Sequence, residues 1–219
     1  MKIILLGGPA CGKGVQAKKI CEKYNLVHIS TGELLRDKIK QNTALSEKLK
    51  ETISSGNLVA DNIICELVKE KISTCQKDGY LLDGFPRTMM QANLYSEFDK
   101  PDIVILLETD KNLALSRVKS RRVCLNCKAS LKVDELKNKH CPYCSGSVGT
   151  RIDDTAEVFE KRYEIYKMQS APLIKYYGDL GLLVKIENNH SIEETFNEII
   201  KSLSKLKELK WLVKKMKNK

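Results

Sequence analysis

Short apolar runs alternate with longer stretches of helical periodicity along this chain. The runs are rich in β-prone residues and lie at positions 3–6, 26–29, 80–82, 103–107 and 182–186. Strands that alternate with helices predict an α/β protein whose parallel sheet is covered by helices on both faces. We therefore expect a doubly wound, five-stranded parallel sheet. Ligands bind such sheets at the carboxyl ends of the strands, so the loops after these runs are candidate positions for chemistry.

Two segments interrupt this alternation and are predicted to be insertions at the ligand-binding edge. Residues 30–58 contain two helical patterns, at 32–40 and 44–55, with no strand pattern between them. Residues 122–150 contain two close pairs of cysteines and few apolar positions. The remaining segments, 1–29, 59–121 and 151–203, are predicted to form the core domain, and residues 204–219 a C-terminal tail.

The net charge of +10 is concentrated in that tail. Residues 201–219 contain eight lysines and one glutamate, so the body of the chain is nearly neutral. Leu206, Leu209, Val213 and Met216 recur at helical spacing among the lysines, with Trp211 beside them. The pattern predicts a basic amphipathic tail, which is either a solvated extension of the last helix or a contact with a membrane surface or an acidic partner.

The apolar runs are all too short to cross a bilayer, which requires about 20 residues. The N-terminal run is also too short for a signal peptide, because a glycine-rich loop follows it directly. We expect a cytoplasmic protein.

The first sixteen residues predict a phosphate-binding loop. Gly7 and Gly12 enclose four residues before Lys13, directly after the apolar run 3–6. At this spacing successive backbone N–H groups can surround a polyphosphate while the lysine ammonium reaches its outer oxygens. The helical stretch from Val15 to Tyr24 directs its N-terminal dipole at the same anion. The position after a buried strand favours this interpretation over a simple glycine-rich turn.

Four of the eight cysteines predict a structural zinc site. Cys124 and Cys127 form one CxxC pair, Cys141 and Cys144 form another, and thirteen residues separate the pairs. An insertion of this size has too small a core to fold alone, so a closed tetrahedral metal site would stabilise it. Protein ligands fill all four positions, which argues against a catalytic metal. A redox pair or a disulfide is the alternative interpretation.

Arginine is scarce among the basic residues, which favours special roles for it. Only seven of the 38 lysines and arginines are arginine, namely Arg36, Arg87, Arg117, Arg121, Arg122, Arg151 and Arg162. A planar guanidinium binds phosphate through two parallel hydrogen bonds, which lysine cannot do. The arginines flank the expected ligand edge, and converging cations are what phosphoryl transfer requires.

Together these motifs resemble the adenylate kinase family in its form with a zinc-bearing lid. The resemblance extends to about residue 203 and includes the segments 28–36 (HISTGELLR), 81–88 (LLDGFPRT) and 151–154 (RIDD). The run from Asp83 to Arg87 is highly specific for nucleoside monophosphate kinases. The resemblance implies the P-loop nucleoside monophosphate kinase fold, with residues 30–58 as the AMP-binding domain and residues 122–150 as a lid that closes over ATP.

The implied reaction is reversible phosphoryl transfer, ATP + AMP = 2 ADP, by a monomer. An oxygen of the AMP phosphate attacks in line and is already anionic, so no general base is expected. Mg²⁺ is expected to bridge the β- and γ-phosphates of ATP, and Asp83 to act on it through water. Lid closure is expected to exclude water, which would otherwise compete by hydrolysing ATP.

The resemblance also assigns roles to positions that match the family's motifs. It implies ATP contacts for Ala10, Cys11, Gly12, Lys13, Gly14, Val15, Arg117, Arg121, Ser130, Leu131 and His190. It implies AMP contacts for Thr31, Arg36, Asn57, Leu58, Val59, Gly84, Phe85, Pro86, Arg87, Gln91, Arg151 and Arg162, with Gln91 reading an adenine edge. The implied catalytic residues are Lys13, Asp83, Arg87, Arg121, Arg151 and Arg162.

The loop departs from the family's usual residues at three positions. Ala10 stands in place of glycine, Cys11 in place of alanine or serine, and Val15 in place of threonine. Asn57 and Ala60 also depart from commoner choices beside the AMP site. We expect altered kinetics rather than inactivity. A thiol beside the phosphates also predicts sensitivity to oxidation or alkylation, with protection by ATP.

Two other functions share part of these motifs. A UMP/CMP kinase shares the loop and the Asp83–Arg87 segment, but Thr31, Gln91 and the cysteine-rich insertion argue against it. A zinc-knuckle protein that binds nucleotides or nucleic acid would need a basic or aromatic surface on the insertion. Its lysines are accompanied there by Asp134 and Glu135, and Tyr143 is the one aromatic residue on the segment.

Overall fold

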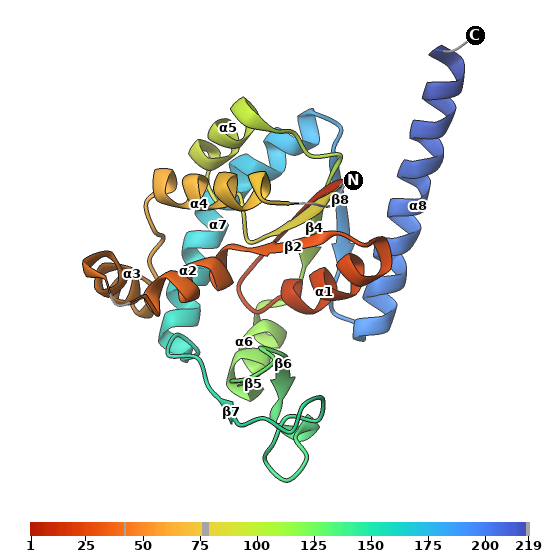
Figure 1. Ribbon diagram of the computed structural model, residues 1–219. Helices are drawn as coiled ribbons and strands as arrows, with labels where there is room; N and C mark the ends of the chain where they lie inside the picture. Colours follow the sequence, from red (N-terminus) through yellow and green to blue (C-terminus); the bar gives the residue numbers. More distant parts are fainter. Residues whose placement is uncertain (42, 76–78, 218–219) are drawn as a thin grey trace.

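A five-stranded parallel sheet forms the centre of the molecule (Figure 1). The computed structural model describes residues 1–41, 43–75 and 79–217, with side chains at 44, 45, 207 and 209–217 outside the description. The strands lie in the order β2-β3-β1-β4-β8, and every neighbouring pair is parallel. Their bounds are β1 Lys2–Gly7, β2 Val27–Ser30, β3 Tyr80–Asp83, β4 Ile103–Glu108 and β8 Leu183–Glu187. Each agrees with a predicted run to within about two residues, so the fold class and the five strands are confirmed.

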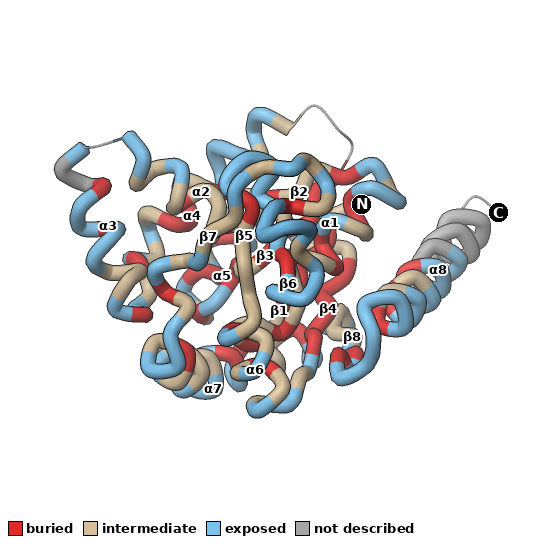
Figure 2. Tube along the Cα trace, turned by 90° about the horizontal axis from the view of Figure 1, so that it is seen from below, coloured by how far each residue is buried: buried red, intermediate tan, exposed pale blue. Residues whose placement is uncertain are grey.

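The two faces of the sheet build two separate hydrophobic clusters, because side chains alternate along each strand. On β1, Ile4 and Leu6 face one cluster and Ile3 and Leu5 face the other. The second cluster is covered by α1 (Lys13–Tyr24) and α8 (Ile192–Lys217). The first is covered by α2 (Thr31–Ile39), α4 (Asp61–Ser73), α5 (Met89–Phe98) and α7 (Ala156–Asp179). Figure 2 shows the buried strands between these exposed helices.

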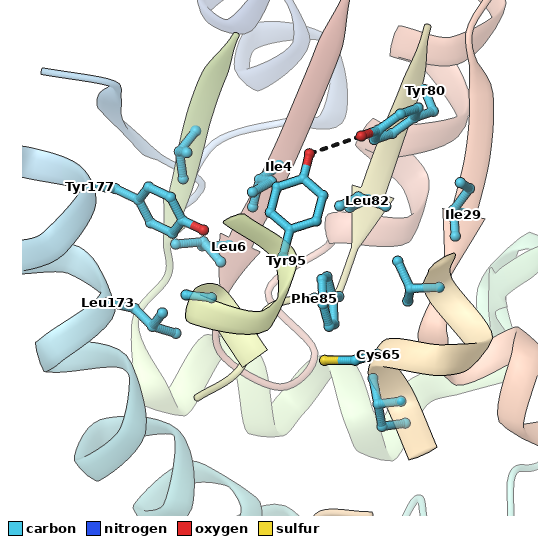
Figure 3. Packing of buried hydrophobic residues seen from close by; sticks show 14 of the residues in the cluster. Ile4, Leu6, Ile29, Cys65, Tyr80, Leu82, Phe85, Tyr95, Leu173 and Tyr177 are labelled. Carbon is cyan, nitrogen blue, oxygen red and sulfur yellow. Dashed lines mark hydrogen bonds between the residues drawn. The ribbon is translucent and has the colours of Figure 1, made fainter. Parts of the chain in front are cut away.

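A buried polar network crosses the first cluster (Figure 3). Tyr80 donates its hydroxyl proton to Asp99 at 2.5 Å, and the Tyr95 hydroxyl donates to Tyr80 at 2.8 Å. Lys2 completes the network through an ion pair with Asp99. Burial raises the pKa of both tyrosines, so both hydroxyls stay protonated and act as donors. The network joins β1, β3 and the end of α5.

The first insertion is helical, as its periodicity predicts. It consists of α2 and of α3 (Ala44–Ser54), and no strand separates them in the part of the segment that is described. Thr43 caps α3 by accepting a hydrogen bond from the Ser46 backbone N–H. Arg162 of α7 donates to the carbonyl of Ile53, which fastens the end of the insertion to the core domain.

The cysteine-rich insertion contains secondary structure that its sequence did not predict. Its antiparallel sheet has the order β6-β5-β7, with β5 at Arg121–Cys124, β6 at Ser130–Lys132 and β7 at Val148–Gly149. A 3₁₀ turn lies within the insertion at Val133–Glu135. The helix α6 (Lys111–Ser120) comes directly before β5. Strands of two to four residues have too few alternating positions to produce a recognisable pattern.

The last helix, α8, continues through most of the basic tail and extends past the sheet (Figure 1). Ile199 and Leu203 are fully buried in the second cluster, and Leu206 packs against its edge. The predicted apolar positions Leu209, Trp211, Val213 and Met216 lie outside the residues whose side chains are described. In the described ranges, none of the helices is both long enough and apolar enough to cross a bilayer.

Candidate functional site

One cavity of about 920 Å³ lies at the carboxyl edge of the central sheet. Its walls come from the loops after β1, β3 and β8, from both insertions and from α7. The predicted residues that line it are Ala10, Cys11, Gly12, Lys13, Gly14, Val15, Thr31, Arg36, Asn57, Leu58, Val59, Asp83, Gly84, Pro86, Arg87, Gln91, Arg117, Arg121, Ser130, Leu131, Arg151, Arg162 and His190. The expectation that the loops after the strands build the site agrees with this geometry.

Two predicted or highlighted residues do not line the cavity. Phe85 is fully buried, and its ring packs edge-on against Tyr95 in the first hydrophobic cluster. The ring faces the core and does not line the cavity, so the AMP contact of Phe85 stays a prediction. Arg122 also lies outside the cavity lining, and its guanidinium donates to the neighbouring carbonyl of Arg121.

The phosphate loop is tightly folded around the Lys13 side chain. The ammonium of Lys13 donates to the carbonyls of Gly7 and Gly8, each at 2.7 Å. A Cβ at Gly7 would lie 2.6 Å from the Cys11 sulfur and 2.7 Å from the Leu107 carbonyl oxygen, so only glycine fits there. Ala10 has a φ of 55°, a left-handed conformation that costs a non-glycine residue about 1 kcal/mol. The substitution of alanine for the family's usual glycine therefore strains the loop.

The Cys11 thiol is buried, and its sulfur lies 3.4 Å from the Lys13 ammonium. The residue is 2% exposed and belongs to the second hydrophobic cluster, together with Ile105 and Leu107. Cys11 is also one of the residues that line the cavity. Ready alkylation or oxidation of this thiol is therefore not supported, because burial shields the sulfur from reagents.

Asp83 supplies an ionised carboxylate beside the loop. Its Oδ2 lies 3.3 Å from Nε2 of His28, and a Cβ at Gly14 would lie 3.7 Å from the same oxygen. Burial acts to raise the pKa of Asp83, but the hydrogen bond from His28 and the charge of Lys13 outweigh it, and the pKa is lowered. The ionised carboxylate therefore lies next to the first turn of α1, where its oxygens suit a hydrated divalent cation.

Six arginines converge on the cavity from α2, α6, β5, α7 and two loops; they are Arg36, Arg87, Arg117, Arg121, Arg151 and Arg162. Two of them are held by carboxylates that sequence reasoning did not single out. Arg162 pairs with Asp153 at 2.5 Å, and Arg121 pairs with Asp154, with its Nε at 2.8 Å from the carboxylate. These carboxylates orient the guanidinium groups without neutralising the whole cluster.

Two other arginines of the cluster each have a buried nitrogen that lacks a partner among the described residues. Nε of Arg151 and Nη1 of Arg117 are buried and have no hydrogen-bond partner among the described residues. Burial, with repulsion from Arg121 and Arg36, lowers the pKa of Arg151 to about 10. Buried donors without acceptors are costly in a folded protein, and an anion with several oxygens would satisfy them. The cavity is therefore suited to phosphate groups.

The opposite end of the cavity is ordered by Asp61 at the start of α4. Gln91 accepts a hydrogen bond from the Arg87 backbone and donates to Asp61, both at 2.8 Å. Thr88 donates to the other oxygen of Asp61 at 3.0 Å, and Thr31 donates to the carbonyl of Gly84 at 2.9 Å. The Gln91 amide retains one N–H and one lone pair for a ligand.

The four cysteines of the second insertion form a cluster that fits a tetrahedral metal. All four sulfur atoms lie within 4.8 Å of one another, with 3.4 Å between Cys124 and Cys144 and 3.7 Å between Cys127 and Cys141. A Zn–S bond of about 2.3 Å places the sulfurs of a tetrahedron about 3.8 Å apart. Disulfide sulfurs lie only about 2 Å apart, so the geometry favours a metal over the disulfide alternative.

Sequence reasoning missed the residues that support the site from behind. These are His28, Asp61, Asp153, Asp154, Tyr166 and Asn188. Tyr166 lies under the loop, where a Cβ at Gly8 would be 3.2 Å from its ring. Asp153 and Asp154 occur in a segment that the resemblance quoted, and Asn188 follows the last strand. These two features of the sequence could have drawn attention to Asp153, Asp154 and Asn188.

A phosphate loop after the first strand of a parallel sheet, opposite converging arginines, defines a P-loop phosphotransferase with two insertions. Residues 5–182 match the family model described as Adenylate kinase. An adenylate kinase of Lachnoclostridium phytofermentans is 42% identical over 215 residues, covering 94% of this chain and 99% of that protein. An adenylate kinase of Caldicellulosiruptor bescii is 41% identical over 213 residues, covering 93% and 99%. The chain belongs to the adenylate kinase family.

Proposed function

We propose that this chain catalyses Mg²⁺-dependent phosphoryl transfer between ATP and AMP, in both directions. The observation that carries the proposal is the single cavity that the phosphate loop, the segment after β3 and six arginines line together. The family membership supports the same reaction. A UMP/CMP kinase is not favoured, since the relatives described above are adenylate kinases.

ATP is assigned to the end of the cavity at the phosphate loop. The N–H groups of the loop and the first turn of α1 bind its phosphates, and the Lys13 ammonium neutralises their charge. Arg117, the backbone at Ser130 and Leu131, and His190 surround the nucleoside. Mg²⁺ bound to ATP supplies Lewis-acid stabilisation of the phosphate oxygens, and Asp83 holds its water ligands. This assignment makes residues 122–150 the lid over ATP.

AMP is assigned to the end of the cavity that residues 30–58 close. Arg36 and Arg87 grip its phosphate, while Thr31, the backbone at 57–59 and Gln91 hold its nucleoside. The spare N–H and lone pair on the Gln91 amide match the donor and acceptor pair on an adenine edge. Residues 30–58 would then form the AMP-binding domain.

The reaction needs positioning and charge stabilisation more than proton transfer. The AMP phosphate attacks as an anion, so no side chain has to remove a proton. Arg121, Arg151 and Arg162 stabilise the charge that spreads over the transferred group, with Asp153 and Asp154 holding two of them in place. Zinc bound by the four cysteines keeps the lid folded, and the closed lid excludes water.

Purified protein with MgATP and AMP, UMP, CMP or GMP, assayed for diphosphate formation, tests the proposal. We expect turnover with AMP well above that with the other monophosphates. Lys13→Met is expected to lower kcat at least about 100-fold, because it removes a charge from the reacting phosphates. Lys23→Met is the matched control, since Lys23 lies exposed on the same helix and outside the cavity. Failure of the wild type to phosphorylate AMP would contradict the proposal.

The cavity is complete within one chain, which supports a monomer as the active species.

The lysine-rich tail supports a separate contact with an anionic surface. A truncation after Leu206 keeps every described core contact of α8, so we expect full kinase activity and weaker binding to vesicles that contain acidic phospholipid. Cosedimentation with acidic and with neutral vesicles measures this, and equal binding by both proteins would identify the tail as a solvated extension.

A further inference from the structure

The segment after β8 contains a buried polar side chain that the proposed reaction does not use. Asn188 is 4% exposed and lies at the cavity beside the phosphate loop. Its partner in the loop is Cys11, which is 177 residues away in the sequence. Its backbone N–H donates to the Glu108 carbonyl at 2.7 Å, which fixes it at the end of β4. A buried amide with this many contacts has a defined orientation.

The hydrogen bonds settle which end of the amide faces the loop. Nδ2 of Asn188 donates to the backbone carbonyl of Cys11, which can only accept. The other end, Oδ1, accepts from the Thr195 hydroxyl at 2.8 Å, and Thr195 is fully buried in the first turns of α8. The chain of contacts therefore runs from α8 through Asn188 to the phosphate loop.

This contact constrains the part of the loop that faces the phosphates. In a trans peptide the carbonyl and the following N–H point in opposite directions, so holding the Cys11 carbonyl also directs the Gly12 N–H the other way. Gly12 has a φ of +89°, and a Cβ there would lie 2.8 Å from Nδ2 of Asn188. The Asn188 amide thus occupies the space that the missing side chain of Gly12 leaves.

The same residue also orients an arginine. The backbone carbonyl of Asn188 accepts from Nη2 of Arg117 at 3.0 Å, while Nη1 of Arg117 is buried without a partner among the described residues. One residue therefore fixes both the loop peptide and a guanidinium group whose second nitrogen is available to a ligand.

We propose that Asn188 is a positioning residue for the phosphate donor, held in place by Thr195. The inference rests on the proposed function only in naming ATP as the donor. The Asn188 side chain acts through the Cys11–Gly12 peptide, so its loss should weaken the donor site and leave the acceptor site unchanged. A purely structural role would affect both sites together.

Steady-state kinetics of Asn188→Ala with each substrate varied separately tests this role. We expect kcat/KM for ATP to fall about tenfold, mainly through KM, with KM for AMP within twofold of wild type. Thr195→Val should shift the same parameter in the same direction, and Thr195→Ser, which keeps the hydroxyl, should restore it. Asn189→Ala is the matched control, since Asn189 is exposed and outside the cavity lining.

Calorimetric titration with MgATP separates this proposal from the assignment of the reaction. A wild type that binds MgATP but does not phosphorylate AMP would overturn the proposed function, and the binding comparison would still test Asn188. The positioning role is overturned if Asn188→Ala binds MgATP within twofold of wild type, or if KM for ATP and for AMP rise equally. If Asn188→Ala does not fold, the same thresholds for MgATP binding and for the two KM values are applied to Thr195→Val, with Thr195→Ser as its control.

Discussion

Asp61 illustrates how a residue outside the cavity can organise the acceptor side. Its two carboxylate oxygens hold Gln91 and Thr88, and Thr88 in turn caps α5 by accepting from the Gln91 backbone N–H. Two side chains at this end of the cavity are therefore fixed relative to each other by one carboxylate. Neither Asp61 nor Thr88 belongs to the predicted site.

Asp61→Ala is expected to raise KM for AMP about five- to tenfold, because it removes one of the two hydrogen bonds that orient the Gln91 amide. KM for ATP should change less than twofold. Initial rates with each nucleotide varied separately measure the effect. Asn62→Ala, an exposed neighbour on the same helix, is the control. Equal effects on the two nucleotides would show that Asp61 supports the fold in general.

The cavity-lining residues could be predicted because their chemistry is local in sequence. Lys13 follows a glycine-bounded loop, and the arginines are conspicuous by their scarcity. Asn188 and Asp61 have no such signal. They are common residue types, and their importance comes from partners 177 and 30 residues away that only folding brings close. Phe85 illustrates another limit of the sequence, since its place in a specific motif does not reveal that the ring faces the core.

At the scale of elements, the cysteine-rich insertion depends on few apolar contacts. Its cluster of buried residues contains Cys124, Leu131 and Cys141, so two of the three are candidate metal ligands. A Cβ at Gly146 would lie 3.2 Å and 3.3 Å from two of the sulfur atoms, which shows how closely the backbone surrounds them. The sulfur cluster is therefore the main stabilising feature of this insertion.

Elemental analysis is expected to find about one zinc ion per chain. Cys141→Ser should lose this metal, expose residues 122–150 to proteolysis and lower kcat, since an unfolded lid cannot close over the donor nucleotide. Cys75→Ser is the control, because Cys75 lies outside the cluster. Full activity and protease resistance in metal-free protein would rule out a stabilising role for the metal.

Strands of the central sheet could be predicted because burial on both faces produces a long run of apolar residues. The β4 strand is apolar over five consecutive residues, 103–107, because helices cover both of its faces. The strands of the second insertion have no such pattern, since each is only two to four residues long. Their pairing joins segments that are separated in the sequence, and so short a strand carries no pattern that reveals its partner.

At the scale of the whole molecule, the network of Lys2, Tyr80, Tyr95 and Asp99 links folding to pH. Burial acts to raise the pKa of Asp99, but hydrogen bonds from Lys2, Tyr80 and the Lys100 backbone outweigh it and hold the pKa below its ordinary value. A carboxyl with a lowered pKa in the folded state stabilises the protein above its unfolded pKa of about 4. That contribution to stability is lost as the pH falls through the lower pKa that Asp99 has in the folded state.

The free energy of unfolding should therefore decrease as the pH falls below about 4, and less steeply in Asp99→Asn. Denaturant titrations between neutral and acidic pH measure both slopes. Asp37→Asn is the control, because Asp37 is exposed on α2 and pairs only with the nearby Lys40 among the described contacts. An unchanged slope in Asp99→Asn would remove this network as a source of acid sensitivity.

The strand order has a consequence for how the protein is made on the ribosome. The phosphate loop is synthesised before β3 and β4, which pair with β1 and whose residues emerge much later. The brace from Asn188 and Thr195 emerges later still. Chains released early from translation contain the complete loop sequence without the neighbours that shape it. Such fragments should be inert toward nucleotides, so interrupted synthesis does not release a product that wastes ATP.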